Sequence, residues 1–208
     1  MPFDSFIFDL DGTLLDTLPD LVRLTNKVLA ERGWPERTHD EVLGFVGGGG
    51  RVLLRRAAPE EASESDVDDA FARWRALYPE FGHALTHPYP GMHETLVQLK
   101  SRGVKLGVLS NKFDEAARKV VADHFPGMFD LVRGECAEIP RKPDPTGLRW
   151  MMAALGVSPA RTAYVGDSVT DMEVARAAGA TPIAVTWGYQ RPTAPLVITT
   201  PSDLLANE

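Results

Sequence analysis

FDLDGTLLDT, residues 8–17, places two carboxylates, Asp9 and Asp11, directly after a short apolar run. Like charges this close together cost free energy unless a cation lies with them. Solvated turn chemistry explains the stretch equally well when it is read alone, because Asp and Gly are common turn residues. The alternative is a metal site beside a nucleophile. The motifs in the rest of the chain distinguish this interpretation from a solvated turn.

Short apolar segments alternate with helical segments over most of the chain after residue 86. Strands are expected at 5–10, 104–110, 129–132, 162–166 and 182–186. Helices are expected at 92–102, 115–125, 145–155 and 171–178. This alternation predicts an α/β fold, a Rossmann-like, doubly wound parallel sheet with helices on both faces.

Residues 18–85 do not follow this alternation, because no convincing strand is found there. Helices are expected at 18–32, 38–45, 51–58 and 66–85. A block of this kind directly after the first strand predicts an all-helical insert that leaves the sheet at one edge.

The overall composition is that of an ordinary globular protein with a net charge of -7. This charge argues against a general binder of nucleic acid or of anionic membranes. The single cysteine, Cys136, cannot form an internal disulfide and fits a reducing compartment. No apolar run reaches the length of a membrane span, and no basic and apolar leader precedes the first motif. We therefore expect a cytoplasmic enzyme or binding protein.

Polar side chains follow each of the central predicted strands. They are Asp9-x-Asp11-Gly12-Thr13, Ser110-Asn111-Lys112 and Gly166-Asp167-x-x-x-Asp171, and the loop Pro140-Arg141-Lys142-Pro143 precedes a helix. Ligands of an open parallel sheet bind at the carboxyl ends of its strands. Together these groups predict a site that holds a phosphate beside a divalent cation.

Magnesium prefers hard oxygen ligands. Asp9 and Asp167, from different strands, can supply carboxylates, with a backbone carbonyl near Asp11 as a third ligand. Ser110 can donate a hydrogen bond to a phosphoryl oxygen, and Asn111 can add polar support.

Lys142 offers a compact positive charge to the same site. A lysine in a proline-rich turn is more often a surface residue, but the neighbouring strand ends favour a role in the site. Gly12 and Thr13 place backbone N–H groups near the expected anion.

These motifs resemble the four motifs of the haloacid dehalogenase-like hydrolase superfamily, in the expected order. The matching segments are residues 1–15 and about 86–190, and residues 16–85 match the helical cap inserted after the first strand. The expected domains are therefore a hydrolase core of residues 1–15 and 86–208 and a cap of residues 16–85. The chain looks most like the phosphoglycolate phosphatase-like branch. That narrower match rests on Leu14-Leu15-Asp16-Thr17, Phe45-Val46-Gly47, Arg141-Lys142-Pro143 and Val185-Thr186-Trp187-Gly188-Tyr189.

The resemblance implies a role for each motif residue. Asp9 would be the nucleophile that forms an aspartyl-phosphate, and Asp11 the general acid and base. Mg²⁺ would be held by Asp9, the Asp11 carbonyl and Asp167, with Asp171 orienting a metal-bound water or a neighbouring ligand. Ser110 and Lys142 would stabilise the transferring phosphoryl group.

Three further features of the sequence carry weaker expectations. The stretch Gly47 to Gly50, followed by Arg51, reads as a flexible connection or as a loop in which Arg51 meets an acidic substrate. Lys112 is as readily a surface charge as a site residue. Asp16-Thr17 and His87-Pro88 are expected to be hinges through which cap closure excludes water.

The predicted function is a magnesium-dependent phosphatase of a small phosphorylated metabolite. A pyrophosphatase, a sugar-phosphate phosphatase and a phosphomutase of the same superfamily stay open, as does a phosphonate-cleaving relative. A non-enzymatic phospho-accepting receiver module is the rival of a different class, but it lacks a helical insert after its first strand. The sequence names neither the substrate nor the oligomeric state.

Overall fold

A computed structural model describes residues 3–206 of the chain. It forms two compact units, one of residues 1–16 and 88–208 and the other of residues 17–87. The sequence places the corresponding boundaries at 15/16 and 85/86.

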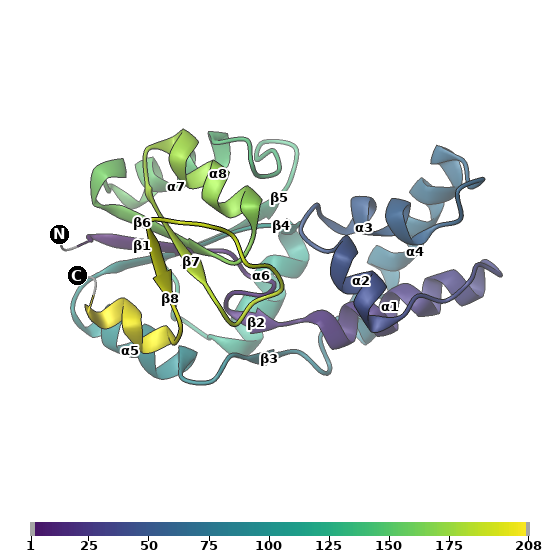
Figure 1. Cartoon of the computed structure of the whole chain (residues 1–208), viewed down its shortest axis with the longest axis horizontal. Coiled ribbons are helices and arrows are strands. Elements are labelled where there is room, and N and C mark those ends of the chain that lie inside the picture. The colour runs from purple at the N-terminus through teal and green to yellow at the C-terminus, as the bar shows by residue number, and fades with distance from the viewer. Residues whose placement is uncertain (1–2, 207–208) are drawn as a thin grey trace. The chain divides into compact units, whose positions relative to one another are not determined.

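The first unit contains a sheet of six strands in the order β5-β4-β1-β6-β7-β8, and every pair of neighbours is parallel (Figure 1). The strands are β1 (Ser5–Phe8), β4 (Lys105–Phe113), β5 (Leu131–Glu135), β6 (Thr162–Gly166), β7 (Thr181–Val185) and β8 (Leu196–Ile198). Strand β1 lies between β4 and β6, so the chain winds outward from it in both directions.

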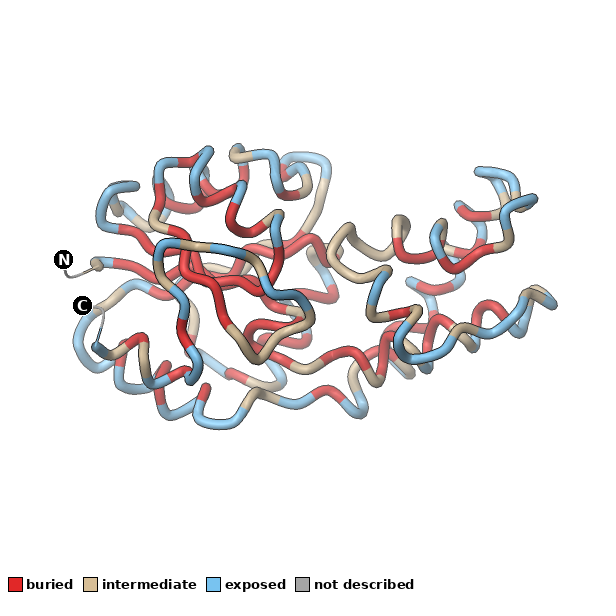
Figure 2. Tube along the Cα trace, viewed as in Figure 1, coloured by how far each residue is buried: buried red, intermediate tan, exposed pale blue. Residues whose placement is uncertain are grey.

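Helices cover both faces of this sheet. They are α5 (Met92–Ser101), α6 (Asp114–His124), α7 (Thr146–Leu155) and α8 (Val169–Ala178), with short 3₁₀ helices η1 (Pro159–Arg161) and η2 (Pro201–Ala206). Successive side chains of a strand point to opposite faces. Accordingly, Phe6 and Phe8 pack with apolar residues of α5 and α6, whereas Ile7 packs with those of α7 and α8. The central strands are buried, as the red tube in Figure 2 shows.

The predicted α/β fold class is confirmed. Strand β1 ends two residues earlier than expected because the chain turns at Leu10, whose carbonyl accepts hydrogen bonds from the N–H groups of Thr13, Leu14 and Leu15. The edge strand β8 was not predicted, and its three residues are too short to give a periodic signal.

The second unit is helical, with α1 (Leu18–Glu31), α2 (His39–Phe45), α3 (Gly50–Ala57) and α4 (Glu64–Phe81). Thr38 and Ser63 begin α2 and α4 with reciprocal capping boxes. Helix α4 ends four residues before the predicted end. The N–H groups of Leu85 and Thr86 instead donate to the buried carboxylate of Asp20 in α1, both at 2.7 Å.

The connecting segments β2 (Leu15–Asp16) and β3 (His87–Pro88) pair in a separate two-stranded sheet. Among residues 3–206, no helix has the length and apolar character that a membrane crossing requires.

Candidate active site

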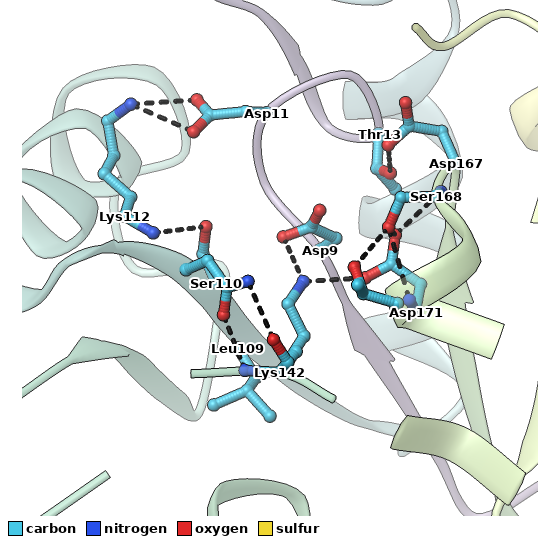
Figure 3. Close-up of polar contacts among 12 residues, drawn as sticks. Asp9, Asp11, Thr13, Leu109, Ser110, Lys112, Lys142, Asp167, Ser168 and Asp171 are labelled. Atoms are coloured by element: carbon cyan, nitrogen blue, oxygen red, sulfur yellow. Dashed lines mark hydrogen bonds and ion pairs between the residues drawn. The ribbon is translucent and has the colours of Figure 1, made fainter. Parts of the chain in front are cut away.

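The predicted site residues of the α/β unit gather at the carboxyl ends of β1, β4 and β6 (Figure 3). The order of the strands reverses direction beside β1, which makes this edge the topological switch point of the sheet. Open α/β sheets bind their ligands at such a point. The fold therefore brings together side chains that are far apart in sequence, such as Thr13 and Asp167, which are 154 residues apart.

Three buried aspartates form an acidic cluster at this edge. One carboxylate oxygen of each of Asp9, Asp167 and Asp171 lies within 4.8 Å of the others. Burial, together with the negative charge of Asp171, raises the pKa of Asp9 to about 8 and that of Asp167 to about 6. The protein thus places carboxylates where, without a cation, they would hold protons near neutral pH.

Lys142 is the ammonium group that faces this cluster. Its Nζ lies 2.7 Å from Oδ1 of Asp9 and 2.7 Å from Oδ1 of Asp171, and its side chain is only 4% exposed (Figure 3). Burial alone would lower the pKa of Lys142, but Asp171 and Asp9 outweigh it and hold the pKa well above its usual value. Lys142 is therefore a charged residue of the site and not a surface lysine.

The cluster fits a divalent cation. When all three carboxylates are ionised, the one ammonium leaves two negative charges uncompensated in a buried place, and carboxylate oxygens are the hard ligands that Mg²⁺ and similar ions take. Asp171 accepts on both carboxylate oxygens, from Lys142 on Oδ1 and from Ser168 on Oδ2.

Asp167 is fixed by neutral donors from two loops. Thr13 Oγ1 donates to its Oδ1 at 3.1 Å, and the backbone N–H of Tyr189 donates to its Oδ2 at 2.7 Å. A carboxylate has about four acceptor positions, so these bonds orient Asp167 without using its whole capacity.

Strand β4 supplies three consecutive buried polar residues at its end, Ser110, Asn111 and Lys112. Its register against β5 shifts between Leu109 and Phe113, the kind of irregularity that re-aims side chains. Asn111 exchanges two hydrogen bonds with the backbone of Lys142, at 2.7 and 3.2 Å. Asn111 thus fixes the loop that carries the lysine.

Asp11 pairs with Lys112, which the sequence left as a weak candidate. Lys112 Nζ lies 2.9 and 3.1 Å from the two carboxylate oxygens of Asp11, and its side chain is 3% exposed. Figure 3 shows the Asp11 carboxylate turned toward Lys112 and away from Asp9. The site therefore holds two separate ammonium–carboxylate groups.

Glycines allow the loops to approach one another this closely. Gly12 has φ +83°, and a Cβ there would lie 2.6 Å from Oδ2 of Asp167. A Cβ on Gly166 would collide with the side chain of Asp171. Both positions require glycine for the aspartates to keep their places.

Arg51 lies in the helical unit, apart from these residues in the chain. Its guanidinium pairs with Asp68 at 2.7 Å and with Glu64 at 2.8 Å, both on the neighbouring helix α4. A contact between Arg51 and substrate stays a prediction.

Sequence reasoning missed the roles of Ser168, Tyr164 and the loop that follows β7. Ser168 forms a capping box with Asp171, and the pattern Ser-x-x-Asp before a helix could have revealed it. Trp187 Nε1 donates to the Thr13 carbonyl, and the hydroxyl of Tyr189 donates to Asp16, so this loop supports the first motif. No local pattern predicts contacts between segments so distant in sequence.

Comparison with known proteins places this arrangement in a family. The family model described as haloacid dehalogenase-like hydrolase matches residues 6–185. The chain belongs to this family. The match includes β1, β4, β6 and all the motif residues of the site, and it confirms the superfamily predicted from the sequence.

Curated relatives carry the name phosphoglycolate phosphatase. The protein from Pseudomonas putida is 36% identical over 189 residues, which cover 88% of this chain and 69% of that protein. The protein from Aquifex aeolicus is 35% identical over 203 residues, which cover 96% of this chain and 93% of that protein. The chain is thus a haloacid dehalogenase-like hydrolase of the phosphoglycolate phosphatase-like branch, as predicted.

Solved structures agree with this placement. A crystal structure from Lactobacillus delbrueckii subsp. bulgaricus has a TM-score of 0.91 at 30% identity and covers 98% of this chain and 97% of that chain. A predicted phosphoglycolate phosphatase from Haemophilus somnus has a TM-score of 0.91 at 27% identity, with 99% and 97% covered. The similarity extends over nearly the whole chain, the helical unit included.

Proposed function

We propose that this hydrolase is a magnesium-dependent phosphatase that removes the phosphoryl group from a small phosphomonoester through an aspartyl-phosphate on Asp9. The observation that carries the proposal is the contact of Asp9 with Lys142, at 2.7 Å, beside a cluster of carboxylates. The proposed nucleophile, Asp9, thus lies close to an ammonium that can contact phosphoryl oxygens and to carboxylates that can bind a metal ion. The family and the names of the relatives support phosphatase chemistry.

Asp9 is proposed to attack phosphorus with one carboxylate oxygen, which forms the acyl-phosphate bond as the bond to the leaving alcohol breaks. Asp11 is proposed to give a proton to that alcohol and then to take one from the water that cleaves the intermediate. In the structure, Asp11 faces Lys112, so its carboxylate would have to turn from this partner during the reaction.

Lys142 and Ser110 are proposed to hold the equatorial oxygens of the phosphoryl group. The backbone N–H groups of Gly12 and Thr13, which the sequence predicts to lie near the anion, donate instead to the carbonyls of Leu15 and Leu10. A bound Mg²⁺ would neutralise charge between the carboxylates and the phosphoryl group. The proposed Mg²⁺ ligands are Asp9, Asp167 and the Asp11 carbonyl. Asp171 is proposed to orient Lys142, with which it forms an ion pair, and the neighbouring ligands of the metal.

Phosphoglycolate, or another small phosphate with a carboxylate, is the proposed substrate, because this is what the names of the relatives suggest. We further propose that residues 1–15 and 86–208 are the catalytic domain and that residues 16–85 are a cap domain that selects the substrate. The protein is proposed to act in the cytoplasm, in keeping with its single cysteine.

The test is phosphate release from a panel of phosphorylated metabolites with Mg²⁺. Phosphoglycolate should give the highest kcat/KM, EDTA should stop turnover and excess Mg²⁺ should restore it. The Asp9→Asn variant, which keeps the shape of the side chain, is the matched control and should be inactive. Robust turnover in EDTA would overturn the metal dependence. A higher kcat/KM for pyrophosphate or a sugar phosphate than for phosphoglycolate would overturn the proposed substrate.

A further inference from the structure

Tyr164 is a fully buried residue of β6 that touches the site and has no role in the reaction described above. Its hydroxyl lies 3.0 Å from Nζ of Lys142 and 2.7 Å from the backbone carbonyl of Leu109. Its ring packs in the cluster formed by Ile7 and the apolar faces of α7 and α8. The ring is thus held by the core while the hydroxyl reaches the edge where the site lies.

The direction of these hydrogen bonds follows from the chemistry of the groups. A carbonyl only accepts, so the single proton of the Tyr164 hydroxyl is donated to Leu109. The hydroxyl oxygen must then accept a hydrogen bond from the Lys142 ammonium, which only donates. Burial raises the pKa of Tyr164 well above its usual value, which keeps the hydroxyl protonated and able to make both bonds.

The tyrosine completes the hydrogen bonds of the ammonium. An ammonium group has three N–H donors, and that of Lys142 has three oxygen neighbours: it donates hydrogen bonds to Asp171 at 2.7 Å and to Tyr164 at 3.0 Å, and it forms an ion pair with Asp9 at 2.7 Å. Without Tyr164, one donor of a buried charged group would lose its partner, which is costly in a place closed to water.

One of these three neighbours of the ammonium changes during the proposed reaction. When Asp9 becomes phosphorylated, its carboxylate charge is lost, and its ion pair with Lys142 weakens. Asp171 and Tyr164 do not react, so they can keep the ammonium in place during the whole reaction. Asp171 is itself fixed by Ser168, and Tyr164 by the Leu109 carbonyl.

We infer that Tyr164 is a positioning residue, which aims the Lys142 ammonium at the transferring phosphoryl group through its buried hydroxyl. This inference rests on the proposed function, since it gives Lys142 the role of holding phosphoryl oxygens. It does not depend on which phosphomonoester is the substrate.

The test compares Tyr164→Phe, which removes only the hydroxyl, with Thr162→Val. Thr162 lies on the same strand, and its buried hydroxyl hydrogen-bonds with Ser5 at 2.8 Å and with the Ser158 carbonyl, not with the site. Tyr164→Phe should lower kcat/KM about tenfold or more and weaken inhibition by inorganic phosphate. Thr162→Val should lose thermal stability but keep both quantities within about twofold.

Equal kcat/KM and equal phosphate inhibition in wild type and Tyr164→Phe would overturn the inference. So would losses of the same size in Thr162→Val, because the effect would then follow stability alone. If Tyr164→Phe does not fold, Tyr164→Met, which also lacks the hydroxyl but adapts its shape, replaces it with the same expected result. The proposed function is tested separately: it requires that wild-type protein turns over a phosphomonoester and that Asp9→Asn does not.

Discussion

Among single residues, the main feature of the site is negative charge that is concentrated where the side chains are largely buried. Asp9, Asp167 and Asp171 are buried, and one ammonium, that of Lys142, lies among them. The excess negative charge can be neutralised by protons on the carboxylates or by a bound cation. The raised pKa values of Asp9 and Asp167 show that protonation is favoured without a metal, and the proposed magnesium ion would replace those protons.

This competition predicts a pH dependence of stability for the metal-free protein. The pKa of Asp9 rises to about 8 and that of Asp167 to about 6, from the ordinary value of 3.8. Between pH 4 and 8 the folded state therefore holds protons that the unfolded state releases, so the free energy of unfolding should fall as the pH rises. Thermal unfolding in EDTA should show a lower midpoint at pH 8 than at pH 5, and Mg²⁺ should reverse much of the loss at pH 8.

Asp9→Asn removes the group with the larger shift, so it should flatten this pH profile and raise the metal-free midpoint at pH 8. The control is Asp69→Asn, at an exposed position of α4, which should leave the profile as it is in wild type. A wild-type unfolding midpoint that rises from pH 5 to pH 8 without metal would show that the pKa values of Asp9 and Asp167 are not raised in the folded protein.

At the scale of elements, strand ends and helix starts place the reactive groups. Asp9 follows β1, Ser110 to Lys112 end β4, and Asp167 follows β6 just before α8. The parallel sheet aligns these ends at one edge because the strands all run the same way. The capping box of Ser168 and Asp171 then fixes the start of α8 and one oxygen of the cluster together.

In the helical unit, Asp20 of α1 joins the first helix to the segment that follows α4. Its Oδ2 accepts from the N–H groups of Leu85 and Thr86 and from the Thr86 hydroxyl, and the residue is fully buried. Asp20→Ala would leave two backbone donors without a partner and should lower the free energy of unfolding by about 2 kcal/mol or more.

Asp20→Asn keeps one acceptor oxygen and should cost clearly less than Asp20→Ala. Urea unfolding of both variants at one pH gives the comparison. Equal losses in the two variants would mean that the charge of Asp20, and not its capping of Leu85 and Thr86, stabilises this unit.

At the scale of the whole molecule, the parts that could be predicted from the sequence are those set by local patterns. The strand and helix alternation after residue 86 gave the sheet, and the motifs gave the family, because each motif has a fixed chemistry at a strand end. The partners of these motifs depend on tertiary contacts. Tyr164 reads as one apolar position of a buried strand, and nothing in its neighbours predicts that its hydroxyl meets Lys142.

The ion pair of Asp11 and Lys112 shows the same limit. The two residues are 101 positions apart, and either one could have been solvated. A lysine at the end of a strand is usually a surface residue, so only the register shift of β4 and the burial of its end identify Lys112 as a site residue.

The proposed division of labour between the units predicts that Arg51 affects substrate choice and not chemistry. Arg51→Ala should raise KM for phosphoglycolate several-fold more than KM for p-nitrophenyl phosphate, because only the former has a carboxylate for the guanidinium. Arg73→Ala, which breaks an exposed ion pair with Glu31 in the same unit, is the control and should change neither. Equal changes in both KM values on Arg51→Ala would remove Arg51 from the substrate site.

Asp9 is proposed to carry the phosphoryl group, so that group should be found on the protein during turnover. Wild-type protein is mixed with its best substrate and Mg²⁺, quenched in acid and mapped by peptide mass spectrometry. A phosphoryl adduct is expected on the peptide that contains Asp9, with no adduct and no turnover for Asp9→Asn. An adduct on another residue, or undiminished turnover by Asp9→Asn, would show that Asp9 is not the nucleophile.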